Sequence, residues 1–420
     1  MEFKQKKITI CILGLGYVGL PLALKLSDKF KVIGFDINLK RINQLKNGYD
    51  LTSEFKKNEL DKKKIKFSSN IKDIGKANFY IITVPTPIKK NKSPDLSYLK
   101  SASIIVSKNL KKNDVVVYES TTYPGCTEEF CIPILEKFSK LKINKEFYCG
   151  YSPERINPGD KIYKLDNIEK IISSTNKFGL SLIQNVYKHV TKKKLIQTDT
   201  IKIAEGAKII ENTQRDINIA LMNELSILFN KLNIDFSKIL KAANTKWNFL
   251  DFKPGLVGGH CIGVDPYYLA FKAKTKKFNT KIVLSGRELN DGMYKYIVKK
   301  FISKLPNSNN KVLIVGLTFK ENVPDSRNSQ SILIAKKLSK LNYDIYMFDP
   351  LVNLDLSGCI TINNFNSLDK YRNYFDGIII LVPHKKIIRK GYNYFNSLRK
   401  KKSVFFDIKN IFKKYSDFKL

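Results

Sequence analysis

The chain has 420 residues, of which 43% are hydrophobic and 11% aromatic, so it is long enough for two or three domains with their own cores. That composition excludes a disordered protein. Lysine and arginine number 75 against 38 acidic residues, a formal net charge of +37. A basic scaffold for nucleic acid or a membrane surface is one interpretation of this charge. The basic runs are short and isolated, however, and no nucleic-acid recognition motif accompanies them, so we expect neither partner.

The first predicted element is a strand at residues 8–13, followed by a glycine loop at residues 14–19, GLGYVG. The apolar stretch of residues 8–26 imitates a signal peptide or a membrane span, but three glycines and a proline inside it favour a nucleotide-binding loop. A strand, this loop, a helix and an acid, Asp36, at the end of the next strand predict a dinucleotide site. Asp36 would bind the adenosine ribose and repel a 2′-phosphate, which favours NAD over NADP, although Arg41 would soften that repulsion.

Two parts of the chain repeat one rhythm of short, β-branched-rich apolar runs separated by helical patterns. Such runs are typical of strands buried on both faces of a parallel sheet. In each part the second run ends in an acid, Asp36 or Asp349, and a proline follows or closes the third. We predict an α/β fold with two doubly wound, Rossmann-like domains that bind ligands at the carboxyl ends of their strands. The predicted strands are residues 8–13, 31–36, 79–84 and 115–118, and residues 312–315, 343–349, 377–382 and 404–407.

Between these parts, residues 201–232 contain no proline and a single glycine, and their apolar positions recur at helical spacing. They predict one helix about 45–50 Å long that joins the two halves and packs against a second copy, giving a homodimer or a higher homo-oligomer. Two helices broken near Asn212 are the alternative. The predicted domains are residues 1–200 for NAD, residues 201–300 for a central helical part with the dimer interface, and residues 301–420 for the second nucleotide.

Residues 258–265, GGHCIGVD, place a lone thiol among three glycines, with a carboxylate four residues on. A thiolate is a strong nucleophile, although a free cysteine is more often a small buried apolar residue. Neighbours in an extended segment point in opposite directions, which argues against a dyad of Cys261 with His260. The six cysteines form no CxxC pair and the chain has three histidines, so we expect no metal site and a reducing cytoplasm.

Other polar residues fall at positions suited to chemistry. Lys208 and Asn212 lie four residues apart and share a helix face, from which they could stabilise an oxyanion or simply face solvent. Thr121 follows the fourth strand, at the sheet edge where nicotinamide should lie, and Glu154 lies in a loop. After the first strand of the second half, a single glycine with Lys320 suits a phosphate rather than a second dinucleotide.

Taken in order, these motifs resemble the UDP-glucose/GDP-mannose dehydrogenase family, and the likeness runs from about residue 8 to residue 410. Residues 205–216, EGAKIIENTQRD, residues 245–249, TKWNF, and residues 252–261, FKPGLVGGHC, are similar to the UDP-N-acetylhexosamine branch. The Vi-antigen type of UDP-N-acetylglucosamine 6-dehydrogenase belongs to that branch, and UDP-N-acetylgalactosamine dehydrogenases are nearly indistinguishable from it.

The resemblance implies an NAD-dependent, four-electron oxidation of the sugar C6 alcohol to a carboxylate, for surface polysaccharide biosynthesis. Cys261 would add to the intermediate aldehyde, forming a thiohemiacetal and then a thioester that water releases. Lys208 and Asn212 match the pair that steadies the oxyanions, and Asp265 matches an acid near the thiol. Thr121 and Glu154 match residues associated with the catalytic water. The residues matched to the NAD site are Gly14, Gly16, Tyr17, Val18, Gly19, Asp36, Arg41, Thr86, Ser120, Thr121 and Arg327. Those matched to the UDP-sugar are Glu154, Arg155, Lys208, Asn212, Phe252, Gly255, Gly258, Phe319 and Lys320.

Two alternatives stay open within enzyme chemistry. UDP-N-acetylgalactosamine or UDP-glucose could be the substrate in place of UDP-N-acetylglucosamine. A one-step hydroxyacid or phosphogluconate-type dehydrogenase shares a nucleotide domain and long helices, but it needs neither Cys261 nor a second nucleotide-binding half. The basic scaffold is the alternative from outside enzymology, and a salt-dependent gel shift with duplex DNA would reveal it.

Overall fold

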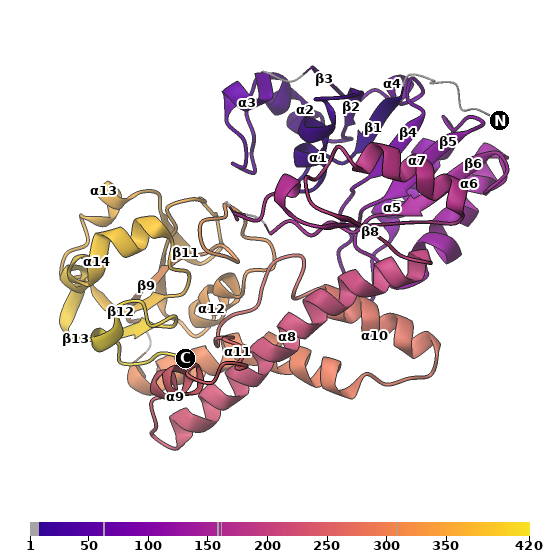
Figure 1. Cartoon of the computed structure of the whole chain (residues 1–420). Helices are drawn as coiled ribbons and strands as arrows, with labels where there is room; N and C mark the ends of the chain where they lie inside the picture. Colours follow the sequence, from indigo (N-terminus) through magenta and orange to yellow (C-terminus); the bar gives the residue numbers. More distant parts are fainter. Residues whose placement is uncertain (1–7, 62–63, 158, 161, 308) are drawn as a thin grey trace. The chain divides into compact units, whose positions relative to one another are not determined.

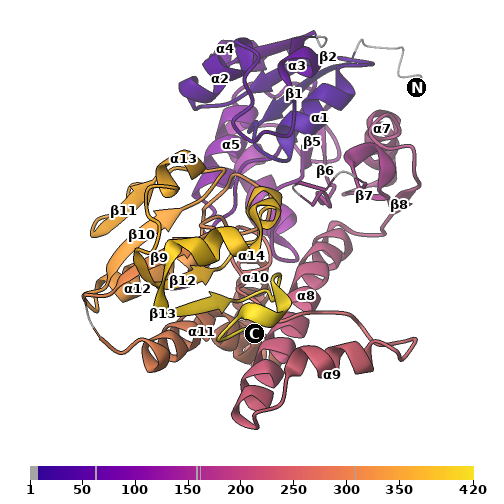
Figure 2. The ribbon, with the colours of Figure 1, turned by 90° about the vertical axis from the view of Figure 1, so that its left-hand side faces the viewer.

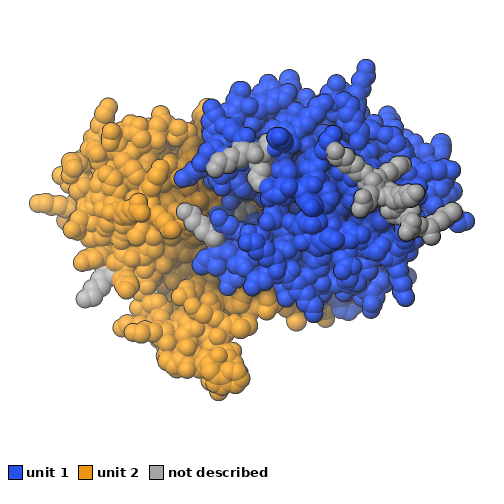
Figure 3. Space-filling model, turned by 45° about the horizontal axis from the view of Figure 1, so that its top comes forward, with its two compact units in different colours: residues 1–211, 267–279 blue, residues 212–266, 280–420 orange. Residues whose placement is uncertain are grey.

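The structure, a computed structural model, describes residues 8–420 except residues 62–63, 158, 161 and 308. The chain forms two compact units, coloured blue and orange in Figure 3. The first unit holds the described residues up to Glu211 together with Tyr267–Asn279, and the second holds Asn212–Pro266 and Thr280–Leu420.

The first unit is built on an eight-stranded sheet with the order β3-β2-β1-β4-β5-β6-β7-β8 (Figure 1). Adjacent strands are parallel except β6 and β7, which are antiparallel. The first six strands have the order of a dinucleotide-binding fold. The strands are β1 (Thr9–Leu13), β2 (Lys31–Phe35), β3 (Ile65–Ser68), β4 (Phe79–Ile82), β5 (Asp114–Tyr118), β6 (Phe147–Tyr151), β7 (Lys170–Ser174) and β8 (Leu195–Gln197). The helices are α1 (Gly19–Leu26), α2 (Leu39–Lys46), α3 (Lys57–Asp61), α4 (Ile71–Ile74), α5 (Ser97–Ser107), α6 (Ile132–Ser139), α7 (Lys177–Tyr187) and α10 (Asp265–Thr275), which starts in the second unit.

The second unit has a five-stranded parallel sheet with the order β11-β10-β9-β12-β13 (Figure 2). The consecutive β9 residues Val312 and Leu313 enter two different hydrophobic clusters, so this sheet is buried on both faces. The strands are β9 (Lys311–Val315), β10 (Asp344–Phe348), β11 (Cys359–Ile362), β12 (Phe375–Ile380) and β13 (Arg399–Asp407). The helices are α9 (Phe236–Ala243), α11 (Lys281–Lys304), α12 (Gln330–Ser339), α13 (Phe365–Leu368) and α14 (Lys385–Leu398).

The predicted α/β fold with two doubly wound parallel sheets is confirmed. The eight predicted strands correspond to β1, β2, β4 and β5 and to β9, β10, β12 and β13. The largest difference is at β13, which begins at Arg399 rather than at residue 404. The domain boundaries drawn from the sequence stay a prediction.

Helix α8 (Ile201–Lys231) is continuous over 31 residues, which confirms the long helix (Figure 1). The alternative of two helices broken near Asn212 is wrong, because no residue in the stretch interrupts the backbone hydrogen bonding. The first turns of α8 belong to the first unit and the rest to the second. Within the described part of the chain, we find no helix with both the length and the apolar character that a membrane span requires.

Candidate active site

The glycine loop between β1 and α1 meets the steric demands of a dinucleotide site. Gly14 has a φ of +94°, and a Cβ there would lie 3.0 Å from the carbonyl oxygen of Thr83. A Cβ at Gly19 would overlap the carbonyl oxygen of Gly14. At Gly16, in contrast, no described atom beyond its chain neighbours lies within 4 Å of a Cβ position. The backbone at Gly16 is therefore open to the close approach of a pyrophosphate.

Asp36 follows β2 and faces this loop. Its carboxylate accepts hydrogen bonds from the backbone N–H groups of Leu15, at 2.9 Å, and Asn38, at 2.8 Å. The guanidinium of Arg41 donates to the carbonyl oxygen of Leu15 at 2.9 Å and pairs with the buried Asp50 at 2.9 Å. Arg41 therefore braces the loop from inside the protein, while Asp36 is the acid at the place predicted for the adenosine ribose.

Thr86, Ser120 and Thr121 lie beyond the carboxyl ends of β4 and β5, the edge at which this fold binds ligands. The hydroxyl of Ser120 donates to the carbonyl oxygen of Val84 at 2.6 Å, which ties the two connections together. Thr86 and Thr121 are half-buried. The structure thus brings these three predicted residues to one end of the sheet.

Glu205, in the second turn of α8, anchors the segment after Thr121. Its carboxylate accepts hydrogen bonds from the backbone N–H groups of Gly125, at 2.5 Å, and Thr127, at 2.9 Å. It also accepts from the hydroxyls of Thr122, at 3.1 Å, and Thr127, at 2.7 Å. These bonds fix the segment to the helix that carries Lys208. The sequence-based prediction missed Glu205, since a glutamate near a helix start carries no signal of such a role.

Glu154 follows β6 and is nearly buried. Its Oε1 accepts from the backbone N–H groups of Arg155 and Ile156, both at 2.6 Å, and its Oε2 lies 3.0 Å from Nζ of Lys170. Burial by itself raises the pKa of Glu154, but Lys170, the N–H of Ile156 and the charge of Lys208 bring that pKa below its usual value. A carboxylate ionised at neutral pH is able to act as a general base.

Arg155 and Lys208 flank this carboxylate in different ways. The guanidinium of Arg155 pairs with Glu211 of α8 at 2.9 Å. Lys208, one turn earlier on α8, is only 8% exposed. The first unit therefore carries the glycine loop, Thr121, Glu154, Arg155 and Lys208.

The thiol of Cys261 lies in a series of turns at residues 259–264, directly before α10. Its side chain is half-buried, and its carbonyl oxygen accepts from the N–H groups of Val264 and Asp265, both at 2.9 Å. The buried carboxylate of Asp265 accepts from Nδ2 of Asn212 at 2.5 Å. The second unit thus joins Asn212 of α8 to the acid at the end of the thiol segment.

The extended conformation predicted at His260 and Cys261 is wrong, because glycine lets the chain turn here. Gly259 has a φ of +82°, and a Cβ there would lie 2.6 Å from the ring of Phe319. The imidazole of His260 packs edge-to-face on Phe319 with 5.7 Å between ring centroids, and its Nδ1 lies 3.9 Å from Asp325. In this structure, Phe319 supports the thiol segment.

Amide side chains hold the backbone on the N-terminal side of the thiol. The amide of Asn223 donates to the carbonyl oxygen of Gly255 at 3.0 Å and accepts from its N–H at 2.8 Å. Nε2 of Gln330 donates to the carbonyl oxygen of Val257 at 2.8 Å. These contacts were missed by the sequence-based prediction, because their partners lie 32 and 73 residues apart in the chain.

The second unit also holds other residues that were predicted to contact the UDP-sugar or the cofactor. Gly258 packs under Asn328, whose carbonyl oxygen would lie 2.7 Å from a Cβ there. Phe252 and Lys320 are half-buried. The guanidinium of Arg327, predicted to reach the cofactor, is paired with Asp325 through Nε at 3.0 Å and Nη2 at 2.5 Å.

Asp349, which follows β10, is the counterpart of Asp36 in the second sheet, but its surroundings differ. Asp349 is buried, and its Oδ2 accepts from the N–H of Leu317 at 2.6 Å. Nδ1 of His384 accepts from the N–H of Asn322 at 2.9 Å, so Nε2 carries the ring proton and donates to Asp349 at 3.0 Å. With its carboxylate engaged inside the protein, Asp349 does not present a ribose-binding acid as Asp36 does. This favours a site for a mononucleotide.

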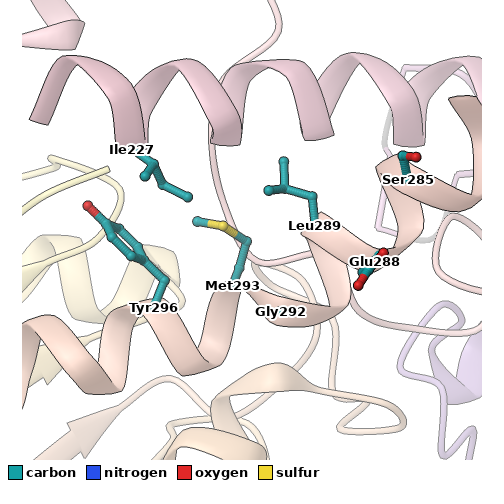
Figure 4. Close-up of a pocket in the computed structure, with 7 residues that line it drawn as sticks. All are labelled: Ile227, Ser285, Glu288, Leu289, Gly292, Met293 and Tyr296. Atoms are coloured by element: carbon teal, nitrogen blue, oxygen red, sulfur yellow. The ribbon is translucent and has the colours of Figure 1, made fainter. Parts of the chain in front are cut away.

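Figure 4 shows a pocket of about 380 Å³ between α8 and α11 in the second unit. Its lining is largely apolar, and none of the predicted site residues takes part in it. The lining residues are Ile227, Ser285, Glu288, Leu289, Gly292, Met293 and Tyr296. A search of the described residues finds no group of histidine, cysteine and acidic side chains that would hold a metal ion.

Comparison with known proteins accounts for both halves and the helix between them. Residues 8–191 match the NAD binding domain of the UDP-glucose/GDP-mannose dehydrogenase family, residues 202–292 its central domain and residues 313–414 its UDP binding domain. The UDP-N-acetyl-D-glucosamine 6-dehydrogenase of Salmonella typhi is 48% identical, covering 97% of each chain, and the enzyme of that name from Pseudomonas aeruginosa is 44% identical, covering 96% of this chain and 97% of the other.

Among solved structures, the UDP-N-acetyl-mannosamine dehydrogenase Cap5O from Staphylococcus aureus has a TM-score of 0.82 and 30% identity. The match covers 98% of this chain and 97% of that one. The resemblance drawn from the motifs is confirmed, and so is the NAD-binding domain. The chain belongs to the UDP-glucose/GDP-mannose dehydrogenase family.

Proposed function

We propose that this oxidoreductase converts the C6 alcohol of UDP-N-acetyl-D-glucosamine to the carboxylate, using two NAD⁺ per sugar. The relatives that are 48% and 44% identical over nearly the whole chain carry that name, which supports this substrate. The observation that carries the chemistry is the thiol segment, where a half-buried Cys261 stands four residues before Asp265, whose buried carboxylate accepts a hydrogen bond from Asn212 of α8. A one-step dehydrogenase has no use for such a thiol.

The glycine loop and Asp36 fit NAD, which accepts a hydride from the reacting carbon when it is bound. The first oxidation gives an aldehyde, which has no alkoxide to expel a second hydride. The thiolate of Cys261 adds to the aldehyde carbon and forms a thiohemiacetal, whose C6 can lose hydride to become a thioester. Lys208 and the amide of Asn212 would stabilise the oxyanions of these steps.

Water then cleaves the thioester between C6 and sulfur, and the thiol is regenerated with release of the carboxylate. Glu154, ionised and nearly buried, would take the proton from this water, with Thr121 orienting the water molecule. Arg155, Phe252, Gly255, Gly258, Phe319 and Lys320 would bind the UDP-sugar, and Arg327 would reach the cofactor. On this proposal, residues 1–200, 201–300 and 301–420 serve as NAD-binding, central and UDP-binding parts.

The substrate is tested by following NADH release with UDP-N-acetylglucosamine, UDP-N-acetylgalactosamine and UDP-glucose side by side. We expect the highest kcat/KM with UDP-N-acetylglucosamine and two NADH for each sugar consumed. A preference for UDP-N-acetylgalactosamine or UDP-glucose would replace the proposed substrate by one of these alternatives. One NADH per sugar would rule out the four-electron reaction.

Asp36 should set the choice of cofactor. We expect the wild type to prefer NAD and Asp36→Asn to lose about 10- to 100-fold in kcat/KM for NAD, since a hydrogen bond to a charged group contributes about 1.5–3 kcal/mol. NADP should suffer less, because the repulsion of its 2′-phosphate is removed. Asp28→Asn, an exposed acid of the same unit, is the control and should leave both values unchanged. Equal use of NADP by the wild type would contradict the role of Asp36.

The proposal includes a homodimer or a higher homo-oligomer formed through α8. Leu221 and Leu228, two helical turns apart on this helix, are 48% and 47% exposed, which supports an apolar face for a second copy. Light scattering of the wild type should give at least twice the mass of the 48.3 kDa chain. The double change Leu221→Asp with Leu228→Asp should give the mass of one chain, and an unchanged mass would point to another interface.

We also propose a cytoplasmic setting, in a pathway to a surface polysaccharide. The six cysteines all lie within the described residues and form no disulfide, which suits a reducing compartment.

A further inference from the structure

A cluster of four ionisable side chains, one of them Glu154, lies buried in the first unit. Its members are Glu119, which follows β5, Glu154, Lys170 of β7 and Tyr187, the last residue of α7. The side chains of Lys170 and Glu119 have no exposed surface, and that of Glu154 is 6% exposed. We call this set the Lys170 cluster. None of its members apart from Glu154 belongs to the site described above.

The ammonium of Lys170 is fully engaged. Nζ lies 2.7 Å from Oε2 of Glu119, 3.0 Å from Oε2 of Glu154 and 3.3 Å from the carbonyl oxygen of Pro153. An ammonium has three protons to donate, and each has an acceptor here. On the far side, the hydroxyl of Tyr187 donates to Oε1 of Glu119 at 2.5 Å. Each carboxylate oxygen of Glu119 therefore has a donor, Tyr187 at Oε1 and Lys170 at Oε2, and Glu119 in turn fixes the position of Lys170.

The hydrogen bonds of Glu154 leave room for one more donor. A carboxylate has about four acceptor positions, and three are taken by Lys170 and by the N–H groups of Arg155 and Ile156. The backbone donors fix Oε1 alone, whereas Oε2 has Lys170 as its partner. The side chain of Glu154 keeps 6% of its surface exposed, and the remaining position is suited to a water molecule. The orientation of Glu154 toward that water thus depends on Lys170.

The two carboxylates around Lys170 are not equivalent. Burial raises the pKa of Glu119 above its usual value, in spite of its bonds with Lys170 and Tyr187. The pKa of Glu154 lies below its usual value, because Lys170, the N–H of Ile156 and the charge of Lys208 together outweigh burial. The pKa of Glu119 is thus held above that of Glu154, so Glu154 is the member that stays ionised more readily.

We propose that Lys170 is a positioning residue for Glu154: it fixes one carboxylate oxygen and keeps the group ionised, while Glu119 secures Lys170. The inference rests on the proposed function for its catalytic consequence, because Glu154 is the group assigned to the water that cleaves the thioester. A buried ion pair is weak support for stability, since desolvation offsets much of the attraction. Positioning of Glu154 therefore explains the buried cluster better than a contribution to stability does.

The experiment compares Lys170→Met, Glu119→Gln and the double variant with wild type, using Lys193→Met, an exposed lysine before β8, as the matched control. The kcat–pH profile is measured with UDP-N-acetylglucosamine and NAD⁺, and the covalent state of Cys261 by mass spectrometry of quenched enzyme. The ionisation of Glu154 is followed separately by ¹³C NMR on protein labelled with [5-¹³C]glutamate, the signal being assigned with Glu154→Gln.

For Lys170→Met, we expect kcat to fall about 10- to 100-fold at neutral pH, an effect within the range for general-base catalysis. The acidic limb of its profile should move up by at least one pH unit, and the thioester should accumulate. The Glu154 signal should titrate at a correspondingly higher pH. Glu119→Gln should keep the acidic limb in place, because the amide oxygen of the new side chain can still accept a hydrogen bond from Lys170, while its NH2 group can donate to the hydroxyl of Tyr187. The control should match the wild type.

Lys170→Met alone could fail to fold, because Glu119 and Glu154 would then repel each other without a cation between them. The double variant avoids this repulsion, since Glu119→Gln removes one of the two carboxylates. It should also shift the acidic limb and the Glu154 signal upward, because Lys170 is absent from both variants. An unshifted Glu154 signal in either folded variant that lacks Lys170, or a kcat loss that is uniform across pH, would overturn the inference. Wild type that releases no NADH with any UDP-sugar would overturn the proposed function instead, while the NMR titration still decides whether Lys170 keeps Glu154 ionised.

Discussion

Replacing Cys261 with alanine is expected to abolish formation of the carboxylate, with a loss in turnover of about 10⁴-fold or more, as for removal of other catalytic nucleophiles. The reason is chemical. The aldehyde formed first cannot lose a second hydride until a nucleophile has added to its carbon, and the thiol is the group proposed to do so. The first oxidation needs no thiol, so the variant should still bind NAD⁺ and form some aldehyde.

The measurement is NADH release together with mass spectrometry of the sugar product. Cys359→Ala is a suitable control, because Cys359 is likewise a half-buried cysteine of the second unit that forms no disulfide. It should turn over like the wild type. Carboxylate formation by Cys261→Ala at an undiminished rate would refute the covalent mechanism.

Glu154→Gln should stop the reaction after both oxidations, at hydrolysis of the thioester. Loss of the general base is expected to slow hydrolysis of the thioester by about 10²- to 10⁴-fold. The two oxidations precede that step, so the variant should release two NADH per active site in a rapid burst and then nearly stop. Mass spectrometry should find the acyl group on Cys261.

Glu169→Gln changes an exposed neighbour of Lys170 in the same way and should show steady turnover without a burst. A Glu154→Gln variant with normal steady-state turnover would remove Glu154 from the hydrolytic step. Loss of the burst itself would place Glu154 in the oxidations instead.

The strands that the sequence revealed share one physical property. β4 and β5 are buried along their whole length, and a strand buried on both faces has a continuous apolar sequence. Five strands were missed: β3, β6, β7, β8 and β11. Three of them, β3, β8 and β11, are edge strands with exposed or half-buried residues. The other two are buried throughout, but Gly150 in β6 and Lys170 with two serines in β7 interrupt the apolar pattern. β13 shows both cases in one element: its buried end was predicted, and its exposed start at residues 399–403 was not.

The glycine loop is the part of the site that was most fully predictable. Its spacing is local, and the observed close approach of Gly19 to Gly14 is a consequence of the tight turn that this spacing encodes. The pairing of Lys170 with Glu119, in contrast, could not be predicted from the sequence. They are 51 residues apart on β7 and beyond β5, and each alone resembles a surface charge in the sequence.

Local patterns were enough to predict the sheet cores, the dinucleotide loop, the long helix and a thiol among glycines, because each depends on neighbours along the chain. Contacts between distant segments appear only in the folded protein, where Asn212 donates to Asp265, Phe319 supports Gly259, and Lys170 lies between two buried carboxylates. A buried charge or amide is tolerated only with a partner, and partners from distant strands and helices meet only when the chain folds.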